Sequence, residues 1–311
     1  MTSQLLTNKK TSQGSRFGTL ICIALTCLMI FFGEELKNSI YNGFLFSFKT
    51  IIPTLFPFFI LSDLWNCCFR LNTSGRLGKT FERIFGIGSI ALPIWLTGLV
   101  CGFPLSVKAA GELWNEGLLN NDEFERLSGF SNNPSLAFVV FGVGGGVLGS
   151  TKIGILLYLT IIISSILTGF LYRISKVKCG FYGKNIEQRF DLVKSIKSAG
   201  FNSITIASYI IFFSGVMGLL SEVMNPKPFA LLSPFIELSN SVKLISTCKD
   251  LSINFKLALI AFALGFSGFS VHLQAFYFFP KGIKRKNYLL MKLTQGLIAS
   301  VISFFTIDLL H

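Results

Sequence analysis

Charge is what this 311-residue chain has least of: Asp, Glu, Lys and Arg together make up 14% of it, whereas hydrophobic residues make up 51%. A soluble domain usually has about a quarter charged residues. Several apolar runs are long enough to cross the hydrocarbon core of a bilayer, which is about 30 Å thick. The composition therefore excludes an ordinary soluble domain and predicts an all-α polytopic membrane protein.

Histidine and paired cysteines are also scarce. The chain has two His, and its seven Cys form no C-x-x-C pair, so we expect neither a metal site nor a disulfide framework. GGGVLGSTK is similar to a phosphate-binding loop, but Lys152 is misplaced and no strand precedes it. No nucleophile–base pair stands out either. We therefore expect no enzymatic activity and no cofactor.

Acidic residues are few beside basic ones, 15 against 28, which gives a net charge of +13. Such a balance can indicate nucleic-acid binding. Here, however, the basic residues cluster in loops between apolar runs, notably 70–83 and 173–197. Cytoplasmic loops of membrane proteins show this excess of Lys and Arg. The pattern predicts a lipid bilayer as partner, excludes nucleic acid, and places both loops in the cytoplasm.

The apolar and basic stretches divide the chain into five segments. We expect a cytoplasmic N-terminal tail at 1–16, a transmembrane helix at 17–32, a first repeat at 33–173, a basic cytoplasmic linker at 174–197, and a second repeat at 198–311. The helix at 17–32 has a positive flank but no small-x-small cleavage site after it. It is therefore expected to stay as a signal anchor.

The stretch 101–134 carries the strongest break signals. Three apolar runs, about 86–101, 134–150 and 152–172, lie between the two basic loops. Three full crossings would put those loops on opposite sides, so one run must enter and leave on the same side. The first run is the natural choice, because Gly102 and Pro104 supply a turn. The next spanning helix is expected to be broken at 131–134, since helix breaks at membrane depth line cavities or lie buried in protein.

The second half of the chain repeats this order of elements. Leu105-Ser106-Val107-Lys108 aligns with Phe269-Ser270-Val271-His272, which predicts a second re-entrant hairpin at 256–280. The chain would then be an inverted repeat of transmembrane helices, re-entrant hairpins and broken helices, with a site at mid-membrane between opposed hairpin tips. A full crossing at 256–280 is the open alternative. It would place the basic stretch 281–286 in the cytoplasm, as the loop-charge rule prefers.

Several motifs resemble the YlbJ-type sporulation integral membrane proteins, within the nucleoside-recognition gate domain group. The matching stretches are TLFPFFILSDL at 54–64, GFPLSVKAAGELWNEGLLNNDEFERLSGFSNNPSLAF at 102–138, IIFFSGV at 210–216, FIELSNS at 235–241 and FALGFSGFSVHLQ at 262–274. The chain departs from the family pattern at Leu105, where a small residue is usual, and at Asn132, where Ser is usual. The halves also resemble those of concentrative nucleoside transporters.

The resemblance implies a multi-pass protein of the mother-cell-derived outer forespore membrane. It implies a transporter of a small organic anion, dipicolinic acid, across that membrane. Three classes of function stay open from the residues: a transporter of a small anion, a transporter of nucleosides or other neutral solutes, and a non-transporting assembly protein of sporulation. A homo-oligomer is left open as well.

The candidate substrate-binding residues sit at the turns and breaks. They are Ser106, Lys108, Asn132, Asn133, Glu237, Ser267, Ser270 and His272. Ser106 and Ser270 are expected where helices restart and offer free N–H groups to an anion. Lys108 would add a full charge, so Lys108→Ala is expected to abolish transport, and His272 would be its counterpart.

The amides of Asn132 and Asn133 would hydrogen-bond a carboxylate or a ring nitrogen. Glu237 is expected to pair with Lys108 or to hold a coupling proton or cation. The structural alternatives are an interfacial Lys108, a structural His272, simple N-caps at Ser106 and Ser270, and a surface-exposed Glu237.

Overall fold

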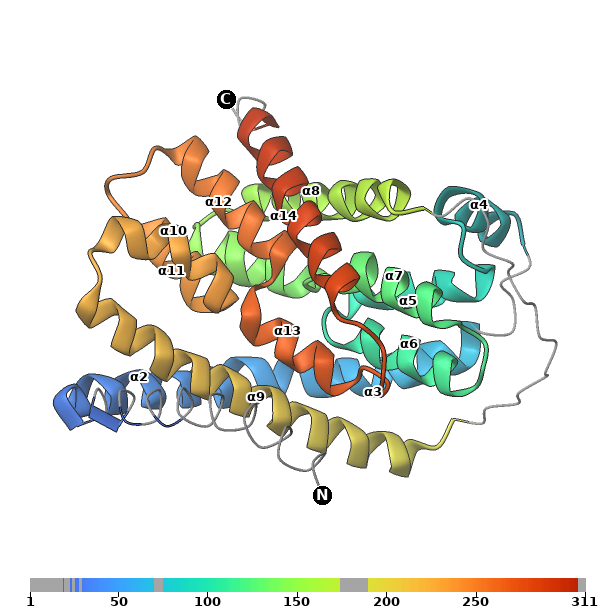
Figure 1. Cartoon of the computed structure of the whole chain (residues 1–311), viewed down its shortest axis with the longest axis horizontal. Coiled ribbons are helices and arrows are strands. Elements are labelled where there is room, and N and C mark those ends of the chain that lie inside the picture. Colours follow the sequence, from blue (N-terminus) through green and yellow to red (C-terminus); the bar gives the residue numbers. More distant parts are fainter. Residues whose placement is uncertain are drawn as a thin grey trace, which may run out of the picture.

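Helices make up the regular secondary structure of the described chain (Figure 1). The computed structural model describes residues 30–69, 75–173 and 190–306, and four single positions between 19 and 27. The expected N-terminal tail, most of the first transmembrane helix and most of the basic linker lie outside these residues. The helical segments are α2 Gly33–Phe46, η1 Ser47–Ile51, α3 Ile52–Phe69, α4 Arg76–Phe85, η3 Ser89–Ala91, α5 Leu92–Val100, α6 Leu105–Asn115, α7 Asn121–Ser131, η4 Phe138–Val147, α8 Thr151–Leu171, α9 Leu192–Val223, α10 Pro226–Ile236, α11 Leu238–Thr247, α12 Ile253–Phe266, α13 Gly268–Tyr277 and α14 Lys286–Thr306.

Four described segments are long and apolar enough to cross a membrane. They are α8, α9, the pair α12–α13 (Ile253–Tyr277) and α14. A fifth candidate, α4 with η3–α5, is bent by 98° and is not a straight crossing. The composition thus led to the right class: the chain is an all-helical integral membrane protein with several apolar helices.

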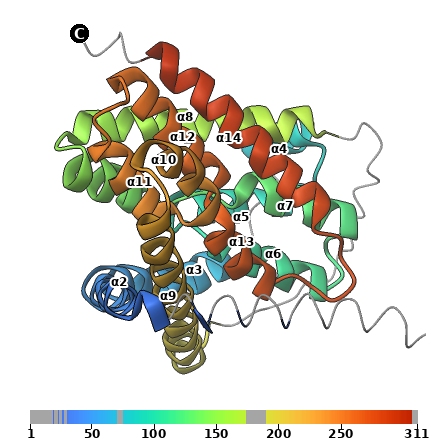
Figure 2. The same cartoon turned by 60° about the vertical axis from the view of Figure 1, so that its left-hand side comes forward.

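Helices α2, η1 and α3 follow one another and run antiparallel to α9 (Figures 1 and 2). At one end of this contact, α9 lies so close to α2 that a Cβ on Gly218 would meet the Ser39 hydroxyl. At the opposite end, Ser195 of α9 donates a hydrogen bond to Asp63 of α3. Small residues along this contact let the two backbones approach closely. The result is a scaffold along one side of the molecule, against which the shorter helices pack.

Two helical hairpins are too short to cross the bilayer. Helices α5 and α6 are joined by the turn 101–104, and α10 and α11 by the single residue Glu237. With nine to eleven residues each, these helices are only about 14 to 17 Å long at 1.5 Å per residue. The hairpins enter from opposite ends of the molecule and direct their tips toward its centre (Figure 1). The re-entrant reading of the run at 86–101 agrees with this geometry.

Two longer segments are broken near their middle. The first is α7 followed by η4, with the break at 132–135, as the sequence predicted. The second is α12 followed by α13, with the break at Ser267. Ser267 has a φ of 79° and Gly268 a φ of 72°, and two left-handed residues in succession cannot continue a right-handed helix. Pro134 contributes to the first break, because proline has no backbone N–H and cannot continue the helical hydrogen bonds of α7.

The prediction of a hairpin at 256–280 is wrong. Ile253–Tyr277 passes as one span-length segment, and the second hairpin is α10–α11 instead. The alignment of Ser106 with Ser270 was therefore misplaced: Ser106 follows a hairpin tip, whereas Ser270 follows a break in a crossing helix. Short Gly/Ser turns look alike in sequence, and only the packing around them shows whether the chain reverses there.

The loop after α13 lies beside the first basic segment. Phe279 and Ile283 share one apolar cluster with Phe81 in α4 and Leu119 before α7. Asn287 donates a hydrogen bond to Glu125 in α7 over 2.7 Å. The basic residues of 281–286 thus lie near those of α4, and we expect both on one side of the membrane, as the loop-charge rule prefers.

Candidate functional site

Each hairpin tip packs on the break of the helix that follows it. A Cβ on Gly98 would stand 1.8 Å from the Ser131 carbonyl oxygen, and one on Gly102 would stand 2.7 Å from the Ser135 amide nitrogen. In the second half, a Cβ on Gly268 would stand 3.2 Å from the Pro234 carbonyl oxygen. Glycine is needed at these contacts because backbone meets backbone. The molecule thus has two units in which a hairpin tip packs on a helix break, α5–α6 with α7–η4 and α10–α11 with α12–α13, and they face each other at its centre.

A cavity of about 360 Å³ lies where the two units meet. The first hairpin tip, the second hairpin tip, both broken helices, α3 and α9 all contribute to its wall. Most of the wall is apolar. The polar side chains among its lining residues are Ser135, Glu237, Ser239, Ser270 and Gln274, and no Lys, Arg or His is among them. Ligand sites of this kind combine an apolar wall with a few oriented polar groups.

Glu237 is the charged group of the cavity wall. It is 2% exposed, so the surface position left open by the sequence is excluded. Its carboxylate accepts hydrogen bonds from the backbone N–H of Ser239 over 2.9 Å and of Asn240 over 2.6 Å. It therefore caps the N-terminus of α11 and places a negative charge where that helix end is positive. The predicted pairing with Lys108 is not formed.

The predicted asparagines lie at the break of α7 in a buried hydrogen-bonded network. The Lys292 ammonium donates to the Asn132 carbonyl oxygen over 2.7 Å and to Gln295 Oε1 over 2.8 Å. Gln295 Nε2 donates to Asn133 Oδ1 over 2.6 Å. The Asn132 amide donates to the Tyr288 hydroxyl over 2.8 Å. These bonds join the break of α7 to α14, and their members are fully buried.

His272 belongs to the same region rather than to the cavity wall. Its Nδ1 lies 3.2 Å from the Tyr288 hydroxyl, and its Nε2 is buried without a hydrogen-bond partner. His272 and Asn132 therefore meet on one phenol from two different broken helices. The ring of His272 also packs edge-on against Phe266 of α12 and against Tyr288 of α14, so it contributes to holding α13 against both helices.

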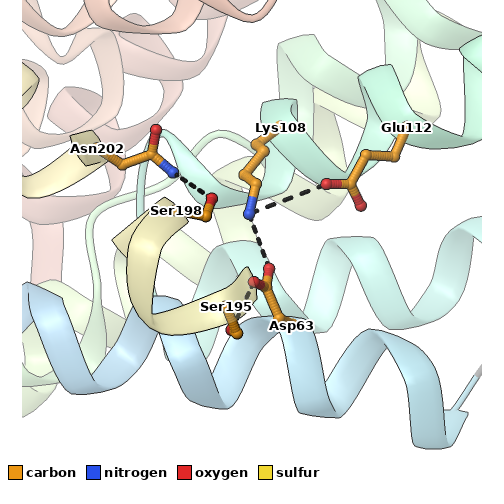
Figure 3. Close-up of polar contacts among 6 residues, drawn as sticks. All are labelled: Asp63, Lys108, Glu112, Ser195, Ser198 and Asn202. Carbon is orange, nitrogen blue, oxygen red and sulfur yellow. Dashed lines mark hydrogen bonds and ion pairs between the residues drawn. The ribbon is translucent and has the colours of Figure 1, made fainter. Parts of the chain in front are cut away.

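Lys108 is the predicted site residue that the structure places elsewhere. Its ammonium lies 2.7 Å from Asp63 Oδ1 in α3 and 3.9 Å from Glu112 (Figure 3). Asp63 in turn accepts a hydrogen bond from Ser195 of α9 over 2.7 Å. Lys108 does not line the cavity. It ties the first hairpin to the α3–α9 scaffold through Asp63, and its role in substrate binding stays a prediction.

The three predicted serines have different surroundings. Ser270 lines the cavity and lies 3.4 Å from Gln274 Nε2. Ser267 donates to the Leu264 carbonyl oxygen over 3.2 Å and so ends α12. Ser106 is fully buried in the first turn of α6, and its hydroxyl has no partner. Of the eight predicted residues, the structure thus brings Glu237 and Ser270 to the cavity, and Asn132, Asn133 and His272 to the adjoining network.

Sequence reasoning missed Lys292, Gln295, Tyr288 and Gln274. One signal was present: Lys292 interrupts the apolar run YLLMKLTQGLIASVISFF, and ionisable residues inside spans are functional candidates. The other three are recognised only from their contacts. No group of three or more His, Cys, Asp or Glu side chains that could hold a metal ion occurs in the part of the chain that the structure describes.

The fold and this centre define a multi-pass helical membrane protein built around two short hairpins and two broken helices. The chain is 25% identical to the sporulation integral membrane protein YlbJ of Bacillus subtilis (strain 168), over 343 aligned positions that cover 92% of this chain and 82% of that protein. This similarity confirms the YlbJ-type resemblance that the motifs indicated. No family model and no solved structure matches the chain.

Proposed function

We propose that this protein is a transporter of a small organic solute, which binds in the cavity between the two hairpin tips. The observation that carries the proposal is the cavity itself, which both tips and both broken helices line together. Many secondary transporters are inverted repeats that bind substrate near the midplane between broken or re-entrant helices. We infer the same pseudo-symmetry here, with α5–α6 and α7–η4 in one half and α10–α11 and α12–α13 in the other.

Dipicolinic acid is the substrate that the family resemblance implies, and the name of the similar protein places that relative in sporulation. The rings of Phe58, Phe103, Phe138 and Phe141 supply apolar walls for a flat aromatic ring. No side chain caps the N-terminus of α6 beside the first tip. Its free N–H groups and partial positive charge favour a carboxylate at that end. In this scheme the protein moves dipicolinate into the forespore across the outer forespore membrane.

A neutral solute such as a nucleoside is the second candidate, because the charges of the cavity wall favour it. Glu237 is negative and no cation is among the lining residues, so a free dianion would be repelled at the second tip. Hydrogen-bonding groups such as Ser239 and Gln274 would suit a neutral polar molecule. A dicarboxylic acid fits the same wall when one carboxyl is protonated or is accompanied by a cation.

Uptake into proteoliposomes tests both candidates. The purified chain should accumulate labelled dipicolinate, and Ala137→Phe, which places a ring in the cavity, should abolish uptake. Leu136→Phe is the matched control, since the neighbouring Leu136 is 42% exposed and is not among the lining residues. Uptake of uridine without uptake of dipicolinate would favour a neutral solute as the substrate. Uptake of neither would leave the assembly role as the remaining reading.

A deletion strain provides the cellular test. Spores that lack dipicolinate while the mother cell accumulates it would support transport at this step, and the wild-type chain should restore the content of the spores. Normal dipicolinate in the deletion spores would remove the leading substrate.

A further inference from the structure

Lys292 is buried in a spanning helix, which is unusual for a charged residue. It is the seventh residue of α14, about 9 Å along the helix at 1.5 Å per residue. Its exposed fraction is 0%, so its ammonium does not reach the interface along its own stem. A charged group at such a depth is expensive unless its surroundings replace water.

The partners of Lys292 are neutral oxygens. No ion pair of Lys292 is found among the described residues. Its ammonium donates instead to the Asn132 carbonyl oxygen and to Gln295 Oε1. Asn132 Oδ1, a further buried acceptor at the same break, has no partner. Two neutral oxygens, one from the break and one from α14, thus bind the ammonium, and Asn132 Oδ1 is a third buried oxygen at the break.

This donor set is of the kind that binds monovalent cations. The Asn132 carbonyl stands at the C-terminal end of α7, where unpaired carbonyls and the helix dipole are negative. In transporters with discontinuous helices, such carbonyl ends coordinate the coupling cation. The oxygens are also held in place: Gln295 Nε2 donates to Asn133, and the Asn132 amide donates to Tyr288. The arrangement is preorganised for a positive charge.

We propose that the break of α7 is a binding site for a monovalent cation, and that the ammonium of Lys292 is its built-in occupant. The site would accept ammonium-type cations or Na⁺ once the lysine side chain is removed. As a consequence that rests on the proposed transport function, substrate uptake by the natural chain should need no Na⁺. Lys292 is a positioning residue in this scheme, because it holds the break beside the cavity and does not line it.

Thermal unfolding of the detergent-purified chain tests the site without any substrate. Lys292→Ala should unfold several degrees below the natural chain, and ethylammonium should restore stability in a saturable way, with a smaller gain from Na⁺. Choline, which is too bulky for the vacated space, should have no such effect. The natural chain should respond to none of the three. An alanine variant as stable as the natural chain, or one that cations do not stabilise, would overturn the proposal.

Lys292→Met is the second variant, and it keeps most of the side-chain volume without the charge. It should be less stable than the natural chain and insensitive to ethylammonium, because the space stays filled while the oxygens lose their donor. Equal or greater stability would show that the charge has no role at the break, and would overturn the proposal even where the alanine variant does not fold.

Substrate uptake measured in Na⁺ and in choline buffers distinguishes a failure of the cation site from a failure of the proposed transport function. Uptake by the natural chain should be equal in Na⁺ and in choline buffers, whereas uptake by Lys292→Ala should rise when ethylammonium is added. Na⁺-dependent uptake by the natural chain would contradict a built-in cation. If the chain takes up no solute at all, the proposed function fails, while the unfolding measurements still decide whether the cation site exists.

Discussion

The two hairpins have the same shape but different chemistry at their tips. The tip of α5–α6 consists of Gly102, Phe103 and Pro104 and carries no charge, whereas the tip of α10–α11 is Glu237, whose carboxylate caps the next helix. The first hairpin is held to the scaffold by the ion pair of Lys108 with Asp63. Within the described ranges, no such ion pair joins the second hairpin to the scaffold.

This difference shows that a re-entrant helix can be stabilised in two ways. At the first tip, the backbone turns through glycine and proline, and the nearest charge, Lys108 in the first turn of α6, pairs with Asp63 and does not line the cavity. At the second tip, a buried carboxylate satisfies the free N–H groups of α11 and fixes the tip directly. No side chain therefore caps the helix that leaves the first tip, whereas the second tip places the Glu237 carboxylate in the cavity wall.

The sidedness of the loop at 281–286 has the largest expected effect, since it is all or none. In a background without native cysteines, Lys284→Cys should react with a membrane-impermeant thiol reagent from the same side as Lys79→Cys. Asp250→Cys, between α11 and α12, should react from the opposite side. Labelling of Lys284→Cys and Asp250→Cys from one side would restore the hairpin at 256–280 and remove the assignment of α10–α11 as the counterpart of α5–α6.

The tip-on-break contacts are expected to differ in their tolerance of a methyl group. Gly98→Ala should lower stability by about 3 kcal/mol or more, because its Cβ meets the Ser131 carbonyl oxygen at 1.8 Å. Gly268→Ala should cost about 1 to 2 kcal/mol, mainly for its left-handed backbone. Gly200→Ala, with nothing within 4 Å, should be neutral or slightly stabilising. Chemical unfolding of the three variants measures the order, and a tolerant Gly98 would contradict the contact.

The anchor of the first hairpin should affect stability more than transport. Breaking the partly buried pair with Lys108→Ala should cost about 2 kcal/mol, in the range of hydrogen bonds to charged groups. A double-mutant cycle with Asp63→Asn should show coupling between the two residues. Substrate KM should stay within about twofold. A variant that remains folded but loses transport would return Lys108 to the binding site, as the sequence first indicated.

The charge at the second tip should tune affinity. Glu237→Gln retains the shape of the side chain and removes the negative charge from the cavity wall. For a dianionic substrate, we expect KM to fall several-fold in uptake assays, because a repulsive charge is lost, together with a stability loss of about 1 kcal/mol from the weaker helix cap. An unchanged KM for dipicolinate alongside an unchanged KM for uridine would show that Glu237 does not face the substrate.

Much of the fold was predictable because bilayer physics acts on local sequence. The turn at Gly102–Pro104 and the break before Pro134 were both marked by residues that end or start helices, and the apolar run at 152–172 corresponds to α8. The hairpin at Glu237 was missed because its helices meet at one ordinary residue, without glycine or proline at the junction. The break at Ser267 was mistaken for a reversal because the same Gly/Ser residues can form either structure.

The candidate site was predictable only in part, for the same reason. Asn132, Asn133 and Ser270 stand near breaks that glycine, serine or proline mark in the sequence, and the structure brings them and Glu237 to the centre of the molecule. Lys108 was predicted there because it follows the first turn closely in sequence, but its long side chain reaches Asp63 in α3 instead. Contact between residues 45 positions apart depends on how two helices pack, which neither periodicity nor composition reveals.

By itself, the sequence determined that this protein is helical, lies in a membrane and is interrupted at specific glycines, serines and prolines. Those properties follow from hydropathy and backbone conformation, which act residue by residue. Tertiary structure alone decided which interruption reverses the chain, which tip meets which break, and that Lys292 lies among the oxygens at the break of α7. The reason is that burial and hydrogen bonding at the centre arise between helices brought together only when the whole bundle is packed.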